Sequence, residues 1–224
     1  RRPDPPLPGI VVEAVPCVSR DMSAAALTSV TAGVQRDLLA LDHSSEEEEE
    51  DDDDDNDNKE KEGDDTVARV RGALATLRAV MAQGTAAMPF GNAAVARLLA
   101  HMRAGRTLLW HCSAGKDRTG VLAMVALRVL GVPRATVAAD YVLTNTCARA
   151  RALAVLARHR RVVERVAGAT LAAAPDRALE TFRDLVGTRR ENIDAAMDAI
   201  DARHGSFEQY LLAEYGVTAL DIQI

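Results

Sequence analysis

The chain has 224 residues, enough for one α/β domain with a substantial core. Hydrophobic residues make up 48% of it but aromatic residues only 3%, so Ala, Leu and Val must fill that core. No apolar run approaches about 18 residues, which argues against a transmembrane helix, and no signal-peptide pattern opens the chain. Three scattered cysteines argue against a disulfide framework and favour a reducing, cytoplasmic setting. The chain opens RRPDPP without a methionine, so we expect an incomplete N-terminus, which leaves secretion open.

The net charge of −6 comes from one acidic segment, SSEEEEEDDDDDNDNKEKEGDD at about 44–65. Outside it the chain has 25 basic and 18 acidic residues and is therefore basic. That excess suits an anionic ligand, or it belongs to arginine-rich helices that only keep the domain soluble. The acidic segment repels itself and predicts a disordered insertion, serving as a tolerated loop or as a regulatory contact, within one domain spanning 1–224.

The first half predicts a strand at 10–15 (IVVEAV), then helices at about 22–41 and 66–83 on either side of the acidic insertion, the second ending at Gly84. A helix is predicted over 91–105, with Asn92 as its N-cap and Gly105 just past its end. TLLWHC at 107–112 predicts a short apolar strand. An apolar helix follows from Thr119 and is stopped by Gly131.

The second half predicts helices throughout, at about 133–145, 147–167 and 176–186. Thr188 with Glu191 and Ser206 with Gln209 fit capping boxes that open two final helices. We therefore expect an α/β fold with a central sheet flanked by helices and a helix-rich C-terminal half. Only two strands are visible, so further strands are expected before the first residue.

The stretch HCSAGKDRTG at 111–120 places a thiol between the predicted strand and helix, where α/β proteins bind ligands. A thiol is a poor nucleophile at its ordinary pKa of about 8.5 and needs its thiolate stabilised. Backbone amides of the small residues 113–115 and the helix N-terminus can do this for Cys112. The Thr119 hydroxyl can donate to the sulfur, and His111 suits orienting the end of the strand.

The same features stabilise a bound phosphate dianion, and the Arg118 guanidinium can grip two of its oxygens. The pattern therefore predicts a thiolate that attacks phosphorus inside an oxyanion cradle. Asp117 either protonates the leaving oxygen or positions the arginine, and Lys116 either favours substrates with several phosphates or stabilises the transition state. The predicted catalytic residues are Cys112, Arg118 and Asp117; the phosphate-binding residues are Ser113, Ala114, Gly115, Lys116, Asp117 and Arg118; His111 and Thr119 support them.

Other interpretations of the stretch fit less well. A nucleotide P-loop needs Ser or Thr after its lysine and a glycine where Trp110 stands. A zinc site lacks a second Cys or His nearby, so we expect no metal and no cofactor. A buried structural cysteine would not need the arginine, threonine and glycine that follow. A sulfurtransferase loop also uses a cysteine, but the Arg-Thr-Gly ending suits phosphate better.

HCSAGKDRTG resembles the HC-x5-R-[ST] signature of the cysteine-dependent protein tyrosine phosphatase superfamily, and its Gly-Lys-Asp-Arg-Thr ending is similar to the bacterial-type family with mycobacterial and listerial members. DYVLTN (140–145), PDPPLPGIVVEAVP (3–16) and the stretch 191–218 also resemble that family. The family's Asn-Phe-Arg-Asp-Leu-Gly segment is absent from this sequence, as is the Trp-Pro-Asp loop of other tyrosine phosphatases.

The resemblance implies hydrolysis of phosphomonoesters through a phosphocysteine: phosphotyrosine, with phosphoserine/threonine and phosphoinositides as further substrates. A non-catalytic phosphate-binding module remains the alternative. The expected partners are phosphorylated proteins or phosphoinositides, with peripheral membrane contact and no nucleic acid. Residues 147–190 correspond to a helical lid in some relatives; here this region is either a basic surface for anions or a solvated helix face. Cys147 is either a resolving thiol or a core residue. The basic residues at issue are Arg149, Arg151, Arg158, His159, Arg160, Arg161 and Arg165.

Overall fold

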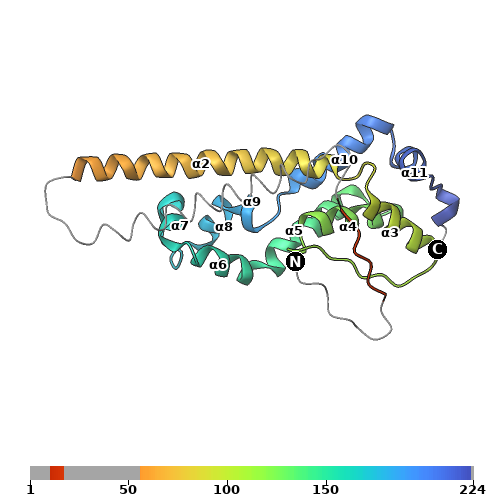
Figure 1. Ribbon diagram of the computed structural model, residues 1–224, viewed down its shortest axis with the longest axis horizontal. Coiled ribbons are helices and arrows are strands. Elements are labelled where there is room, and N and C mark those ends of the chain that lie inside the picture. Colours follow the sequence, from red (N-terminus) through yellow and green to blue (C-terminus); the bar gives the residue numbers. More distant parts are fainter. Residues whose placement is uncertain (1–10, 18–55, 223–224) are drawn as a thin grey trace.

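The computed structural model describes residues 11–17 and 56–222, and in these ranges every regular element is a helix (Figure 1). The predicted helix at 22–41 and residues 44–55 of the acidic segment lie outside the described residues. The elements are α2 (Asn56–Ala87), α3 (Ala93–Arg103), α4 (Asp117–Val129), α5 (Arg134–Cys147), α6 (Arg149–Ala157), α7 (Arg160–Ala167), α8 (Pro175–Thr181), α9 (Arg183–Val186), α10 (Arg190–His204), α11 (Phe207–Tyr215) and the 3-10 helix η1 (Ala219–Ile222).

The prediction of a central sheet is wrong for this structure. Residues 11–17 and 106–112 are extended but form no ladder in the part of the chain that the structure describes. They include the predicted strand at 107–112 and all of the predicted strand at 10–15 except residue 10, which lies outside the described residues. An apolar extended segment becomes a strand only when another backbone takes up its N–H and C=O groups, and the sequence pattern cannot supply that partner. Leu109 shows the consequence, since 86% of it is exposed where a sheet would have been expected to cover it.

One apolar core lies among the helices around the predicted loop. It joins side chains of α3, α4, α5, α10 and α11, with Tyr210 and Val125 completely buried. Tyr210 keeps its hydroxyl satisfied by donating to the Pro89 carbonyl at 2.8 Å. Leu108 and Trp110 of the extended segment pack against this core, so the residues that lead into the loop have a fixed support.

A second core lies under the long helix α2, between that helix and α6 to α9 (Figure 1). Val70, Leu74, Leu77 and Met81 recur at helical spacing along α2 and form its buried stripe. Phe182, between α8 and α9, is fully buried against them. Because α10 packs against α2 as well as α4 and α5, the two cores are held together on either side of the loop.

Several predicted helix ends are confirmed. Asn92 is the N-cap of α3, and its side chain accepts a hydrogen bond from the Ala94 amide. Gly105 follows that helix with φ +64°, and Ser206 caps α11 by accepting from the Gln209 amide. Helix α2 differs from the prediction at both ends, since it begins at Asn56 inside the acidic segment and continues past Gly84 to Ala87.

Three other predictions about the C-terminal half need correction. The helix expected over 147–167 is two helices, interrupted at Arg158 and His159, and that over 176–186 is interrupted at Phe182. Thr188 does not cap α10, because Arg189 stands at the N-cap position. Thr188 instead donates its hydroxyl to the Tyr141 carbonyl, so a tertiary contact has replaced the local one. None of the described helices is long and apolar enough to span a membrane.

Two helical glycines should respond oppositely to substitution by alanine. A Cβ at Gly120 would lie 2.5 Å from the Tyr141 ring, so Gly120→Ala should lower the free energy of unfolding by about 1–3 kcal/mol. A Cβ at Gly72 in α2 meets nothing within 4 Å, so Gly72→Ala should raise it by about 0.5–1 kcal/mol through helix propensity. Urea unfolding of both variants measures this, and a destabilised Gly72→Ala or a neutral Gly120→Ala would contradict it.

Candidate active site

The predicted loop lies between the extended segment and the N-terminus of α4. Residues 113–116 bend, Gly115 has φ +70°, and α4 begins at Asp117. The Trp110 indole donates to the Thr119 carbonyl at 3.3 Å and so ties the segment before the loop to the helix after it. The turn that the sequence predicted around Cys112 is therefore present, although the residues that the structure describes form no sheet beside it.

The Cys112 sulfur faces donors from the loop. Burial alone would raise its pKa, but the Thr119 hydroxyl and the backbone amides of Ala114, Gly115 and Thr119 lower the pKa of Cys112 from 9.0 to about 7. The Gly115 amide donates to the sulfur at 3.3 Å. The buried Thr119 hydroxyl meets no acceptor with full hydrogen-bond geometry among the described residues. The nearby Cys112 sulfur is therefore the acceptor to which it can donate. A substantial fraction of Cys112 is therefore thiolate at neutral pH.

Arg118 extends across the mouth of the loop. Its guanidinium donates to the Ser113 hydroxyl at 2.7 Å, so the side chain is held over the loop rather than turned into solvent. His111 is exposed, and its Nδ1 lies 3.1 Å from the Cys112 carbonyl, a distance at which a protonated Nδ1 donates. This position suits the predicted role of His111 in orienting the end of the extended segment.

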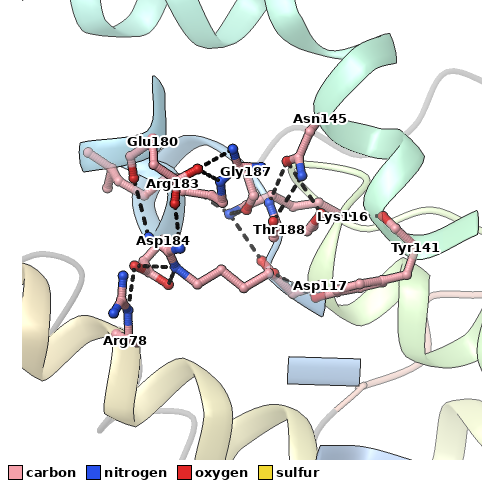
Figure 2. Close-up of polar contacts among 12 residues, drawn as sticks. Arg78, Lys116, Asp117, Tyr141, Asn145, Glu180, Arg183, Asp184, Gly187 and Thr188 are labelled. Atoms are coloured by element: carbon pink, nitrogen blue, oxygen red, sulfur yellow. Dashed lines mark hydrogen bonds and ion pairs between the residues drawn. The ribbon is translucent and has the colours of Figure 1, made fainter. Parts of the chain in front are cut away.

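Lys116 extends toward Gly187, between α9 and α10 (Figure 2). Its ammonium donates to the Gly187 carbonyl at 2.7 Å and to the Leu185 carbonyl at 3.4 Å, and pairs with the Asp117 carboxylate at 3.5 Å. The side chain is only 12% exposed. An ammonium has three N–H groups, so these contacts use its donor capacity.

Asp117 lies between Lys116 and Tyr141. One of its carboxylate oxygens faces the Lys116 ammonium, and the other accepts a hydrogen bond from the Tyr141 hydroxyl at 3.4 Å. Burial, followed by the neighbouring Asp117, raises the pKa of Tyr141 well above its ordinary value, so this hydroxyl remains a donor. Gly120 allows the arrangement, because only a residue without a Cβ lets α4 approach the Tyr141 ring so closely.

The segment that receives Lys116 is itself fixed to α5. The Asn145 amide donates to the Thr188 carbonyl at 2.9 Å and accepts from the Thr188 amide at 2.8 Å (Figure 2). A Cβ at Gly187 would lie 2.5 Å from the Asn145 side-chain oxygen, so glycine is required where the segment passes. The Lys116 anchor therefore rests on a rigid backbone.

A buried carboxylate fixes the same segment to α2. Arg189 places its Nε 2.8 Å from both oxygens of Asp184, whose side chain is 3% exposed, and Arg78 of α2 reaches the same carboxylate at 3.3 Å. Two guanidinium partners satisfy a charge that would be costly to bury alone. Helix α9 and the chain that follows it are thus joined to the Cys112 loop, α5 and α2.

A second cysteine, Cys17, interacts electrostatically with Arg118 and Cys112 of the site, and the sequence did not point to it. Burial raises the pKa of the Cys17 thiol, and the nearby Cys112 also raises it. The Asn92 amide, which lies 3.5 Å from the Cys17 sulfur, and Arg118 lower it. Cys147, considered above as a resolving thiol or a core residue, is exposed at the end of α5. Its exposure argues against the core role.

The structure brings residues 111–119 together as predicted and adds three that sequence reasoning missed. Tyr141 and Asn145 both belong to the DYVLTN stretch, whose resemblance was noted without a role for either side chain. Arg151 of α6 donates to the Ala114 carbonyl at 3.3 Å and was noted only as one of many basic residues. Among the described residues no group of His, Cys, Asp and Glu side chains is arranged to hold a metal ion.

The Thr119 hydroxyl should control the ionisation of Cys112. Thr119→Ala removes a group that lowers the thiol pKa, so that pKa should rise from about 7 toward 9.0, by about one unit, while Thr119→Ser should keep it low. The measurement is the pH dependence of iodoacetamide alkylation at Cys112, followed peptide by peptide so that Cys17 and Cys147 are read separately. Coincident curves for Thr119→Ala and the unaltered chain would rule out this role.

The Lys116 anchor should contribute to stability. Lys116→Met leaves the Gly187 and Leu185 carbonyls without this donor, and we expect a loss of about 1–3 kcal/mol in the free energy of unfolding. Arg149→Ala, which removes an exposed ion pair with Asp176, is the matched control and should cost less than about 1 kcal/mol. Equal urea midpoints for the two variants would mean that the Lys116 contacts contribute no more to the free energy of unfolding than an exposed ion pair does.

Comparison with known proteins agrees with this geometry. A model of the tyrosine phosphatase family matches residues 11–224. The chain is 38% identical over 107 residues to "Putative tyrosine-protein phosphatase H16_A0669" of Cupriavidus necator, covering 48% of this chain and 34% of that protein. It is 33% identical over 123 residues to "Triple specificity protein phosphatase PtpB" of Mycobacterium tuberculosis, covering 53% of this chain and 42% of that one. The matches thus span less than half the length of either relative. With its family model matched along nearly the whole sequence, this chain belongs to the tyrosine phosphatase family.

Proposed function

We propose that this chain is a cysteine-dependent phosphatase that hydrolyses phosphomonoesters through a phosphocysteine intermediate. The observation that carries the proposal is the state of Cys112: a thiol with its pKa lowered to about 7, beside amides and an arginine that suit a phosphate group. Membership of the tyrosine phosphatase family supports the same reaction class.

In the first step the Cys112 thiolate attacks phosphorus, an S–P bond forms and the ester P–O bond breaks. The amides of the loop and the Arg118 guanidinium stabilise the charge on the three non-reacting oxygens. Arg118 must exchange its bond with the Ser113 hydroxyl for the phosphate, which costs little because a charged acceptor replaces a neutral one.

Asp117 is the acid we assign to the departing alcohol oxygen, since it lies in the loop next to Arg118. In the second step water attacks phosphorus, the S–P bond breaks, and Asp117 accepts the proton of that water. Lys116 and Tyr141 contact the two oxygens of Asp117, and the contact at the oxygen that carries the proton must open when that proton is passed to the departing oxygen. These two contacts make them positioning residues in the proposed mechanism.

The proposed substrates begin with phosphotyrosine and extend to phosphoserine, phosphothreonine and phosphoinositides. The name of the mycobacterial relative, a triple specificity phosphatase, supports a broad range. The loop residues 113–115 are small and exposed, which favours a site that admits different leaving groups.

A non-catalytic phosphate-binding module is the second candidate. Both oxygens of Asp117 face donors, so the structure presents this side chain as an acceptor rather than as an acid. Such a loop would bind phosphoesters tightly and release them unchanged. The two candidates differ in turnover and not in binding.

Phosphate release without added metal separates them. We expect turnover of a small aryl phosphate and a phosphotyrosine peptide by the unaltered chain, loss of turnover to the background rate in Cys112→Ser, and retention in Cys147→Ser, whose thiol is exposed outside the loop. Binding of the peptide without turnover, with Cys112 confirmed as reduced, would favour the binding module. Turnover that persists in Cys112→Ser would reject the mechanism.

A further inference from the structure

One peptide unit of the loop lies between the nucleophile and a helix further along the chain. The Gly115 amide donates to the Cys112 sulfur at 3.3 Å, and the Ala114 carbonyl accepts from the Arg151 guanidinium of α6 at 3.3 Å. This carbonyl and this amide belong to the same peptide unit. Arg151 therefore contacts a backbone group that is directly bonded to a donor of the reacting sulfur.

The geometry of a peptide unit couples the two contacts. A trans peptide unit is planar, so its C=O and N–H groups point in opposite directions. The described residues contain no cis peptide bond. A donor that fixes the direction of the Ala114 carbonyl thus also fixes the direction of the Gly115 N–H. Arg151 holds the carbonyl toward α6, and this orientation turns the amide toward Cys112.

Glycine at position 115 makes this orientation one that the loop can lose. Gly115 has φ +70°, and glycine adopts positive and negative φ with similar ease. The two common types of β-turn differ mainly in the direction of their central peptide unit and in the sign of φ at the residue after it. The backbone alone therefore does not fix the Gly115 amide toward the sulfur, and a partner at the Ala114 carbonyl selects that direction.

Helix α6 gives this partner a fixed base. Ala152 and Leu156 are buried, and Arg149 pairs with Asp176 of α8. The guanidinium of Arg151 is a charged donor, and such a donor bonds a carbonyl more strongly than a neutral one does. It also polarises the peptide unit, which makes the amide at its other end a better donor to an anionic sulfur.

We propose that Arg151 is a positioning residue that keeps the peptide unit of Ala114 and Gly115 turned toward Cys112 and so maintains the reactivity of the thiolate. Arg151 touches neither the sulfur nor the substrate in this role and acts through the backbone. For turnover the inference rests on the proposed function, because the same amide would face the oxygens of the transferred phosphate. A shift of α6 away from the loop would remove the donor and weaken the nucleophile.

The first test measures the ionisation of Cys112 by the pH dependence of its alkylation with iodoacetamide, followed peptide by peptide. Arg151→Ala should raise the pKa of the Cys112 thiol from about 7 by about half a unit, because the amide faces the sulfur for less of the time. Arg158→Ala is the matched control. It removes the same charge from the exposed C-cap of α6, about two turns away, and should leave the curve unchanged.

Salt separates the backbone route from a direct attraction between charges. An exposed guanidinium acting on the thiolate through space is screened in about 0.5 M KCl, where the Debye length is only about 4 Å, whereas a hydrogen-bonded amide is not. The shift caused by Arg151→Ala should therefore persist in this salt. A shift that disappears in salt, an equal shift in Arg158→Ala, or no shift at all would overturn the proposal.

NMR follows the amide itself. In the unaltered chain the Gly115 amide proton should change its chemical shift when Cys112 ionises, because it donates to that sulfur. The change should be smaller in Arg151→Ala and undiminished in Arg158→Ala. A change of full size in Arg151→Ala would show that the amide keeps its direction without the arginine, and would refute the positioning role.

Turnover gives a separate measurement. The acid limb of the pH profile of kcat/KM for a small aryl phosphate should move up by the same half unit in Arg151→Ala, which is about a threefold loss on that limb. A chain with the alkylation shift but no turnover would reject the phosphatase and support the positioning role. An active chain whose acid limb is unmoved by Arg151→Ala would reject the positioning role and leave the phosphatase intact.

Discussion

The insertion of the Lys116 ammonium between the carbonyls of Leu185 and Gly187 is the contact on which the arrangement of this site depends. It joins the Cys112 loop to the end of α9 and the residue that follows it, and thus joins one apolar core to the other. A charged donor to two backbone acceptors in a largely buried place is stronger than a neutral hydrogen bond and more costly to break. The same ammonium also faces the Asp117 carboxylate, so the contact that fixes the loop also fixes that side chain.

The polar and charged groups around the loop differ in what they contact. Thr119 and the loop amides act on Cys112 and lower its pKa, while Arg118 lies over the same loop from the side of Ser113. Lys116 faces the protein, and Arg151 of α6 donates to the Ala114 carbonyl. The polar and basic residues that the sequence places in one stretch therefore differ in what they contact: Thr119 acts on Cys112, Arg118 on Ser113, and Lys116 on the chain at the end of α9.

Helix positions were largely predictable, because spacing of apolar residues and caps are local properties. Asn92 and Ser206 cap their helices as the sequence indicated. Failures occurred where a distant contact outweighed the local signal. Thr188 had the spacing of a capping box but bonds Asn145 and Tyr141 instead. The apolar stretch 107–112 is extended as its composition suggests, but no described backbone pairs with it, and pairing is the step that local sequence does not specify.

The sequence by itself determined the nucleophile loop, since the order of His111, Cys112, Arg118 and Thr119 within ten residues fixes a turn that holds thiol, amides and guanidinium together. Because only four residues separate Cys112 from the start of α4, few other arrangements of these groups are open to the backbone once α4 has formed. Only the tertiary structure decided the contacts of Tyr141, Asn145 and Arg151, which lie on other helices, and of Gly187, which lies between α9 and α10. Contacts between residues dozens of positions apart depend on how the two cores pack on either side of the loop, and the spacing of residues in the sequence does not specify that packing.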